Sequence, residues 1–416
     1  MRQTGPSQIN DTSLLPPGRR TIVYVTMSLD TGGTEKHLSL VVPRLRDHGW
    51  TPIVYCLWRR GAFAAVLEQA GIEVIGRDAP DRAARDWKRD GLHLARAWLR
   101  LARLVARRKP QIMHFFLPLA YMLGAPLAIL LRVPVKVMSR RSLNIYQGGQ
   151  SAVHRVECWL HARMNAVVAN SRRVARDLID SEGCPPDKVG LIYNGTDLSA
   201  VSAVAPADGP GESKAAPSLT LIIVANLIPY KGHADLLTAL GGIASQLPQG
   251  WRLLCAGRDE GCGQQLIEQA GQLGIGANVH FLGERSDVPR LLRTADIGIL
   301  CSHQEGFSNA VIEGLAAGLP MVVTDVGGNA EAVADGETGL VVPPRDPAAL
   351  GRAILALAAE PDRRRSMGRA AREDAVRRFS IESCVDRYDR LYRGLMDHKL
   401  PGEIEGLRVT LSRAEA

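Results

Sequence analysis

Short apolar runs alternate with longer amphipathic segments along most of the chain. Residues 21–30 and 51–58 have the continuous apolar, β-branched character of buried strands, and residues 31–50 between them carry apolar residues at helical spacing. The same alternation continues through residues 134–143, 152–180, 219–240, 251–258 and 278–300. Strands that alternate with helices in this way predict parallel sheets covered by helices. We therefore expect an α/β fold with two Rossmann-like, doubly wound domains that face a cleft.

The alternation is interrupted near the middle of the chain. Residues 200–218 are small, rich in Pro and Gly and without periodicity, which predicts a linker. Residues 1–18 are polar and predict a loose tail. We expect a first domain over residues 19–199, a second over 219–379, and a helix followed by a tail over 380–416. A chain of 416 residues is long enough to give each domain its own core.

Two segments resemble membrane elements. The apolar run 115–131 has 17 residues, fewer than the roughly 20 that span a bilayer, and Pro118, Gly124 and Pro126 interrupt it. We expect a buried strand followed by a buried helix there. Residues 91–110 predict a basic helix with Leu92, Ala95, Leu99, Ala102 and Val105 or Ala106 at helical spacing. Such helices bind anionic membranes in some proteins and are plain crossover helices with a solvated face in others.

Charge is distributed unevenly between the two halves of the chain. Residues 1–200 contain 29 Lys and Arg against 16 Asp and Glu, whereas the remainder contains 22 against 27. A basic half suggests an anionic partner, such as a membrane surface, a lipid-phosphate acceptor or nucleic acid, although a solvated basic face is the simpler interpretation. No nucleic-acid-binding motif accompanies the basic residues, so nucleic acid is not expected.

The seven cysteines are scattered and form no CxxC or Cys/His cluster. Their odd number and the absence of a signal-peptide pattern predict reduced thiols in a cytoplasmic protein. Association with the inner face of a membrane is the alternative location that the basic half suggests.

The stretch 302–333 carries the clearest candidate chemistry. It holds two acids, Glu305 in a polar loop after an apolar strand and Glu313 within an apolar helix. Ser308 and Asn309 are helix-capping residue types, so the helix should begin there with backbone N–H groups that point back into the loop. Such a helix start binds anions, and it would lie at the carboxyl edge of the sheet.

The string EGFSNAVIEGLAAGLPMVVTDVGG, residues 305–328, resembles the C-terminal signature of the retaining nucleotide-sugar glycosyltransferases of family 4. The resemblance implies the GT-B fold of two Rossmann-like domains. It also implies that Glu305 faces the donor sugar, that Glu313 binds the nucleotide ribose, and that the donor site includes Phe307, Ser308, Asn309 and Ala310. A capped helix with two incidental acids would leave Glu313 on an apolar face without a reason.

Other segments match the same family. Gly32 and Gly33, followed by Thr34, resemble its first glycine loop, which lies over the donor and the acceptor, although a plain turn is an alternative. Lys231 precedes a helix at the position where the family clamps the pyrophosphate, whereas a surface lysine is the commoner role for a single Lys. The family usually has an Arg five residues earlier, and this chain has Asn226 there.

The resemblance assigns further residues to the two substrates. Gly283 to Arg285 lies where the family loop reaches the nucleotide base. Arg140 and Arg141 follow a strand on the acceptor side, and Phe116 stands where the family often has a His near the donor sugar. Asn194-Gly195 resembles the family's hinge, and the helix within residues 379–396 would cross back onto the first domain.

Together these features predict a metal-independent retaining glycosyltransferase. It would move a hexosyl or N-acetylhexosaminyl group from a nucleotide diphospho-sugar, with a UDP-sugar favoured over a GDP-sugar, to a sugar or lipid-linked acceptor in cell-surface polysaccharide or glycolipid assembly. No cofactor is expected, and the cleft segments contain neither an Asp-x-Asp triplet nor a His cluster. Lys231 and the helix start would stabilise the leaving diphosphate.

Two alternatives share parts of this pattern. A nucleotide-sugar 2-epimerase has the same fold but should have a different set of acids and histidines. A non-catalytic dinucleotide-binding protein needs no acid that faces a sugar, and the absence of G-x-G-x-x-G after the first strand counts against it.

Overall fold

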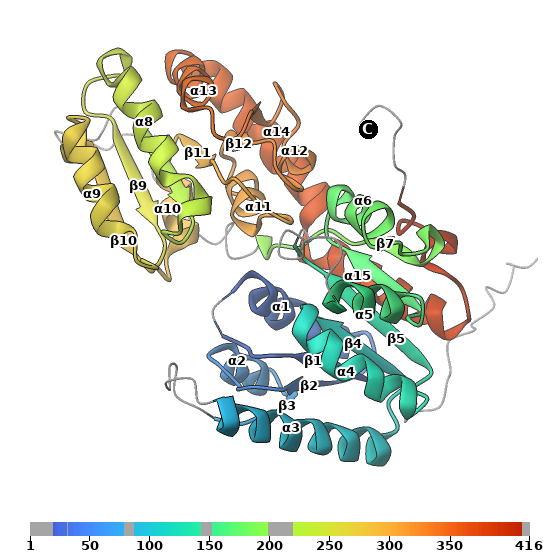
Figure 1. The fold of residues 1–416 in the computed structure, drawn as a ribbon. Coiled ribbons are helices and arrows are strands. Elements are labelled where there is room, and N and C mark those ends of the chain that lie inside the picture. The colour runs from blue at the N-terminus through green and yellow to red at the C-terminus, as the bar shows by residue number, and fades with distance from the viewer. Residues whose placement is uncertain (1–19, 31, 79–86, 143–151, 199–218, 410–416) are drawn as a thin grey trace, which may run out of the picture.

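Seven parallel strands form the first sheet, and their order in it differs from their order in the chain (Figure 1). The structure, a computed structural model, describes residues 20–30, 32–78, 87–142, 152–198 and 219–409; the expected tail 1–18 and linker 200–218 lie outside them. The sheet order is β3 (Glu73–Ile75), β2 (Thr51–Cys56), β1 (Thr21–Thr26), β4 (Ile112–Phe116), β5 (Val135–Arg140), β6 (Ala166–Ala169) and β7 (Val189–Leu191). The chain order reverses between β1 and β4, where open parallel sheets bind ligands.

Six parallel strands form the second sheet in a similar way. Their order is β10 (Val279–Gly283), β9 (Arg252–Ala256), β8 (Thr220–Val224), β11 (Ile297–Leu300), β12 (Met321–Thr324) and β13 (Gly339–Val342). The chain order here reverses between β8 and β11. The two sheets therefore each offer one crevice at the carboxyl ends of their central strands.

Helices cover both faces of each sheet, because successive strand residues point to opposite sides. Ile22 and Tyr24 belong to one hydrophobic core and Val23 and Val25 to another. The first sheet is covered by α1 (Gly33–Asp47), α2 (Phe63–Gln69), α3 (Trp87–Arg108), α4 (Pro118–Leu130), α5 (Ala152–His161) and α6 (Arg172–Asp180). The second sheet is accompanied by α8 (His233–Ile243), α9 (Gly263–Gln272), α10 (Val288–Thr294), α11 (Asn309–Ala316), α12 (Asn329–Ala332), α13 (Pro347–Ala359) and α14 (Pro361–Phe379).

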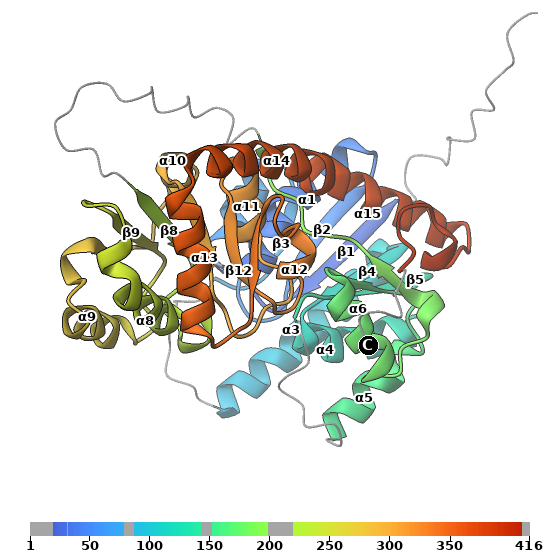
Figure 2. The same ribbon diagram turned by 90° about the horizontal axis from the view of Figure 1, so that it is seen from above.

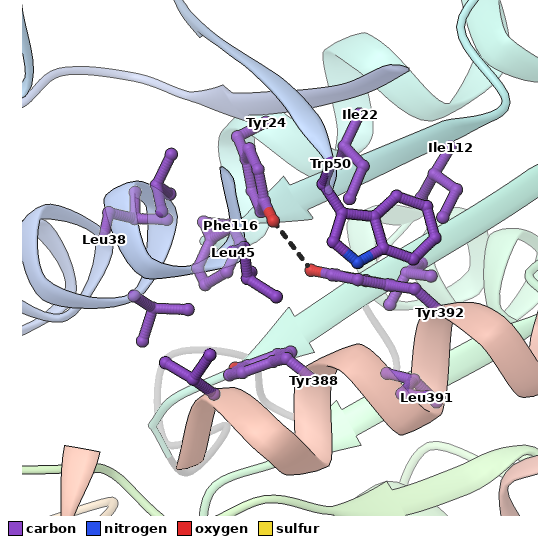
Figure 3. Close-up of a cluster of buried hydrophobic side chains, with 14 of the residues drawn as sticks. Ile22, Tyr24, Leu38, Leu45, Trp50, Ile112, Phe116, Tyr388, Leu391 and Tyr392 are labelled. Carbon is purple, nitrogen blue, oxygen red and sulfur yellow. Dashed lines mark hydrogen bonds between the residues drawn. The ribbon is translucent and has the colours of Figure 1, made fainter. Parts of the chain in front are cut away.

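The last long helix returns the chain to the first sheet. Helix α14 ends at Phe379 beside the second sheet. After Ser380, α15 (Ile381–Met396) continues in nearly the same direction and packs against α1 of the first domain (Figure 2). Tyr388, Leu391 and Tyr392 of α15 join the core of β1, β4 and α1, and the hydroxyls of Tyr24 and Tyr392 lie 3.2 Å apart (Figure 3). The C-terminal segment thus supplies part of the first core.

Helix α3 buries only part of the apolar stripe that its sequence predicts. Ala97, Leu101 and Val105 are buried, whereas Leu92 and Leu99 are 53% and 48% exposed. The helix has two apolar stripes, so periodicity alone cannot choose between them. The structure shows that the Tyr55 hydroxyl donates to the carbonyl of Ala97, on the stripe that faces the sheet.

The apolar run 115–131 divides into the end of β4 and helix α4, as predicted. The proline at its start, Pro118, occupies the first turn of α4, where its missing N–H costs no hydrogen bond. Among the described residues, no helix combines the length and the apolar character needed to cross a bilayer.

Candidate active site

A cavity of about 410 Å³ lies where the two crevices face each other. Its first-domain wall consists of Gly33, Thr34, Leu117, Arg141, Ser142, Asn170 and Asn194. Its second-domain wall consists of Val224, Ala225, Asn226, Ile228, Tyr230, Lys231, Leu300 and residues 305–310. Most of these residues follow the carboxyl ends of β1, β4, β5, β8 and β11, so the topology explains why they meet.

A lysine and a glutamate form an ion pair in the second-domain wall. Lys231 Nζ lies 2.6 Å from Glu305 Oε1, and the Ser302 hydroxyl donates to the same oxygen at 2.9 Å. The two charged side chains are only 18% and 12% exposed. Gly232 allows this approach, because its φ is +76° and a β-carbon there would overlap the carbonyl oxygen of Cys301. The loop after β8 can therefore lie against the end of β11.

Lys231 is the cation of this loop at neutral pH. His233, two residues further on, is buried, and burial together with the charge of Lys231 lowers the pKa of His233 to about 4. The imidazole is therefore neutral at pH 7, and the positive charge that faces the cavity comes from Lys231.

Two helices begin at the cavity. Helix α11 begins at Asn309 and α1 begins at Gly33, and neither N-cap residue provides a side-chain hydrogen bond to the first turn. The side chain of Asn309 donates to the carbonyl of Gly33 at 3.3 Å, which places the two helix starts side by side. Their free N–H groups and aligned dipoles make this part of the cavity favourable for an anion.

The second acid of the conspicuous pair bridges the domains. Glu313 on α11 lies 2.6 Å from Lys36 Nζ on α1, with 13% and 47% of the side chains exposed. Glu313 does not line the cavity itself. No local sequence pattern pointed to Lys36, because its partner lies 277 positions away.

A third acid, Glu331 of α12, caps a helix of the other domain. Its two carboxylate oxygens accept the N–H groups of Arg172 and Arg173 at 2.8 and 2.9 Å, in the first turn of α6. The Tyr193 hydroxyl also donates to it at 3.0 Å. A carboxylate at a helix start compensates both the free N–H groups and the dipole. Its place in GGNAEAV gave no sign of this role.

Most of the residues expected to bind the donor lie around the cavity. Those that line it are Gly33, Asn226, Lys231, Glu305, Phe307, Ser308, Asn309 and Ala310. Thr34, expected on the acceptor side, also lines it. Gly32 is the N-cap of α1, beside the wall. Gly283 and Arg285 do not line it, and Arg285 pairs with Asp287 at 2.8 Å.

The expected acceptor-side positions need two corrections. Phe116 is buried, with its ring 4.4 Å from that of His114, because it is the last residue of β4 and faces the core. The next residue, Leu117, lines the cavity instead. Arg140 is likewise buried and faces away from the cavity, whereas Arg141 lines it.

Arg140 belongs to a buried charge network behind β5. It pairs with Glu157 at 3.0 Å and with Glu182, whose other oxygen lies 2.7 Å from His161 Nε2. Burial alone would raise the pKa of Glu182, but the His161 hydrogen bond and the Arg140 charge lower it overall. Glu157, His161 and Glu182 have the spacing of metal ligands, yet a cation there would have to displace Arg140.

Comparisons with known proteins agree on one group of enzymes. Residues 210–374 match the family described as glycosyl transferases group 1, and residues 31–200 match glycosyltransferase family 4. Glycogen synthase from Mycobacterium tuberculosis is 30% identical over 315 residues, which are 73% of either chain. D-inositol 3-phosphate glycosyltransferase from Nocardia farcinica is 33% identical over 215 residues, which are 50% of this chain and 48% of that protein.

Solved structures show the same architecture. Anabaena Alr3699/HepE in complex with UDP has a TM-score of 0.74 at 22% identity and covers 90% of this chain and 100% of its own. A glycosyltransferase from Rickettsia africae has a TM-score of 0.75 at 20% identity, with 91% and 99% covered. The predicted GT-B fold, an α/β fold of two Rossmann-like domains, is confirmed.

The Glu331 cap can be tested by substitution. Glu331→Ala should lower the free energy of unfolding by about 1–2 kcal/mol, because it leaves two N–H groups of α6 without their partner. Amide hydrogen exchange should become faster at Arg172 and Arg173. Glu337→Ala, at an exposed position of the next turn, is the control and should change neither quantity. Unchanged exchange at α6 in Glu331→Ala would show that this contact between the domains is not formed in solution.

Proposed function

The chain belongs to the glycosyl transferases of group 1, and we propose that it moves a hexosyl or N-acetylhexosaminyl group from a nucleotide diphospho-sugar to a sugar or lipid-linked acceptor. The observation that carries this proposal is the Lys231–Glu305 pair beside the open start of α11, within a cavity between the two domains. It combines a cation and free N–H groups for a leaving diphosphate with an acid that can hold sugar hydroxyls.

A UDP-sugar is the proposed donor. Structures of the similar Anabaena Alr3699/HepE are described as complexes with UDP, with UDP and glucose, and with UDP-glucose. That protein shares its fold with this chain at 22–23% identity, which favours a uridine nucleotide over a guanosine nucleotide. Cell-surface polysaccharide or glycolipid assembly is the corresponding proposed role.

Each charged group has one part in the proposed reaction. Lys231 and the N–H groups at residues 308–310 stabilise the negative charge that develops on the diphosphate as the glycosidic bond breaks. Glu305, held by Lys231 and Ser302, accepts hydrogen bonds from the donor-sugar hydroxyls. Glu313 accepts those of the ribose, and its ion pair with Lys36 holds the carboxylate in position.

An anionic membrane surface is the proposed further partner, because α3 exposes both apolar and basic residues. The exposed Leu92 and Leu99 share the helix with Arg96, Arg100 and Arg103. Helices α3, α4 and α5 are neighbours along one side of the first domain (Figure 2), and Leu130 of α4 and Trp159 of α5 are 71% and 49% exposed. An apolar surface edged by arginines suits the boundary between lipid headgroups and acyl chains. The enzyme would then act at the inner face of the membrane.

Removal of the proposed diphosphate cation tests the function. Lys231→Ala should lower turnover of the UDP-sugar by roughly a hundredfold or more, because one preorganised charge is lost. A thermal-shift screen of nucleotide sugars first identifies the donor, since a ligand at a hundred times its Kd stabilises by about 2.7 kcal/mol. Release of UDP with and without candidate acceptors then gives the turnover. Lys399→Ala is the matched surface control. Activity of Lys231→Ala at the control level would contradict the proposed site.

The proposed stereochemical course is retention without a metal ion. Retaining hydrolases place two carboxyl groups about 5–5.5 Å apart across the reacting carbon. Here Glu313 pairs with Lys36 and does not line the cavity. Among the described residues that line the cavity, Glu305 is the only acid. The leaving diphosphate is therefore the proposed base for the acceptor hydroxyl. NMR coupling constants should show an unchanged anomeric configuration, and activity should survive a chelator. An inverted product or loss of activity with the chelator would refute this part of the proposal.

Membrane binding is tested by co-sedimentation with vesicles. Vesicles that contain phosphatidylglycerol should bind the protein at low salt and release it as salt rises, whereas phosphatidylcholine vesicles should bind it weakly. The double variant Arg96→Gln/Arg100→Gln should bind roughly 25-fold more weakly, at about 1 kcal/mol for each charge. The control Arg365→Gln/Arg369→Gln removes the same charge from α14 and should bind normally. Equal binding by both variants would assign the arginines of α3 to an ordinary solvated face.

A further inference from the structure

Arg141 differs from the other cations of the cleft in having no acidic partner. Lys231 pairs with Glu305 and Lys36 pairs with Glu313, but among the described residues Arg141 forms no ion pair. Its guanidinium hydrogen-bonds instead to two neutral groups, the side-chain oxygen of Asn194 at 2.8 Å and the hydroxyl of Tyr388. The residue lines the first-domain wall of the cavity and is only partly exposed.

The aromatic groups around this guanidinium, Tyr388, His37 and His114, are neutral at pH 7. Burial raises the pKa of Tyr388 to about 12, and the pKa values of His37 and His114 are held well below their usual range by burial and by the charge of Arg141. Burial also lowers the pKa of Arg141 itself, so its charge is costly where it stands. Glu35 is the acid whose charge acts on it, but burial raises the pKa of Glu35 and the two form no ion pair.

The orientation of Arg141 is fixed by its neighbours. The amide nitrogen of Asn194 donates to the carbonyl of Phe307 at 3.2 Å and to Asn309 Oδ1 at 2.7 Å. These two bonds turn the amide oxygen of Asn194 toward Arg141. A guanidinium has five N–H donors, and Asn194 and Tyr388 engage only some of them, so donors are left for a further partner.

A second polar group of the same wall also lacks a partner. Asn170 is 97% buried and lines the cavity; its amide nitrogen donates to the carbonyl of Arg141 at 3.3 Å, while its side-chain oxygen has no hydrogen bond among the described residues. Buried polar atoms are nearly always paired in folded proteins. An unpaired cation and an unpaired acceptor atom next to each other suit a ligand that carries both an anionic group and a hydroxyl.

We propose that Arg141 binds a phosphate group of a substrate in this cavity. The guanidinium matches a phosphate bidentately. The inference rests on the proposed function and deepens it, because a phosphate on the first-domain wall belongs to a phosphorylated acceptor. The diphosphate of the donor is the other source of the same chemistry, because Asn226 stands where the family resemblance implies a second cation on the second-domain wall.

Binding of two probes to the full chain separates these sources. UDP is titrated into the free protein, and inorganic phosphate is titrated into the protein saturated with UDP, both by calorimetry. Arg141→Gln should weaken phosphate binding by about tenfold or more and leave the Kd of UDP unchanged, if the acceptor carries the phosphate. A comparable loss of UDP affinity instead would assign the Arg141 phosphate to the donor. Arg141→Lys keeps the charge without the fork and should lie between wild type and Arg141→Gln.

Controls keep the test decisive. Arg369→Gln removes the same charge from an exposed position of α14 and should bind both probes as wild type does. Tyr388→Phe changes no charge but removes the hydroxyl that hydrogen-bonds to Arg141. It should weaken binding of the Arg141-dependent probe, inorganic phosphate or UDP, only a few-fold, and it replaces Arg141→Gln if that variant does not fold. Wild-type affinity for both probes in every Arg141 and Tyr388 variant would overturn the inference. A loss of affinity in Arg369→Gln equal to that in Arg141→Gln would overturn it as well. Failure of the wild type to bind any nucleotide would contradict the proposed function itself.

Discussion

Close backbone approach between the domains is the constraint on which the cavity depends. A β-carbon at Gly306 would overlap the carbonyl oxygen of Arg141, and one at Gly328 would overlap the ring of Phe307. Gly328 also donates its N–H to the carbonyl of Gly306 at 2.8 Å. The loop that carries Glu305 is thus held between a turn of its own domain and a strand end of the other. Any side chain at these positions would separate the walls that bear Lys231 and Arg141.

Charge within the cleft is balanced by pairs that a substrate must share. Two unit charges 4 Å apart attract by about 4 kcal/mol at an effective dielectric constant of 20. Separating Lys231 from Glu305 without a replacement partner would forfeit this attraction. In the proposed complex the diphosphate replaces Glu305 as the partner of Lys231, while sugar hydroxyls replace Lys231 as the partner of Glu305. The free protein therefore holds both side chains in place at little electrostatic cost, and ligand binding exchanges partners rather than creating isolated charges.

The sequence predicted what depends on local pattern, namely the strands, the helices, the loop positions of Lys231 and Glu305, and the helix start at Asn309. It did not predict contacts between distant segments, such as Lys36 with Glu313 or Glu331 with α6, because nothing near either partner encodes the other. The predictions for Phe116 and Arg140 were each wrong by one residue. Phe116 and Arg140 end strands, so each points to the opposite face from its successor. The position of the strand end decides that Leu117 and Arg141, rather than Phe116 and Arg140, line the cavity. The buried stripe of helix α3 was only partly predicted for a related reason, since its two apolar stripes have the same period.

The two places where the chain crosses between the domains lie together, and Asn194 of the first crossing lines the cavity. Thr196 donates its N–H to the carbonyl of Phe379 at 2.8 Å and accepts the N–H of Ile381 at 3.0 Å, so the crossings at residues 194–197 and 379–381 are hydrogen-bonded to each other. Asn194, two residues before Thr196, contacts both Arg141 and Asn309. A rotation of one domain relative to the other about this joint would therefore move the Asn194 amide that orients Arg141. Asn194 lies beside the residues that join the domains, so a rotation that closed the cleft would also realign Arg141.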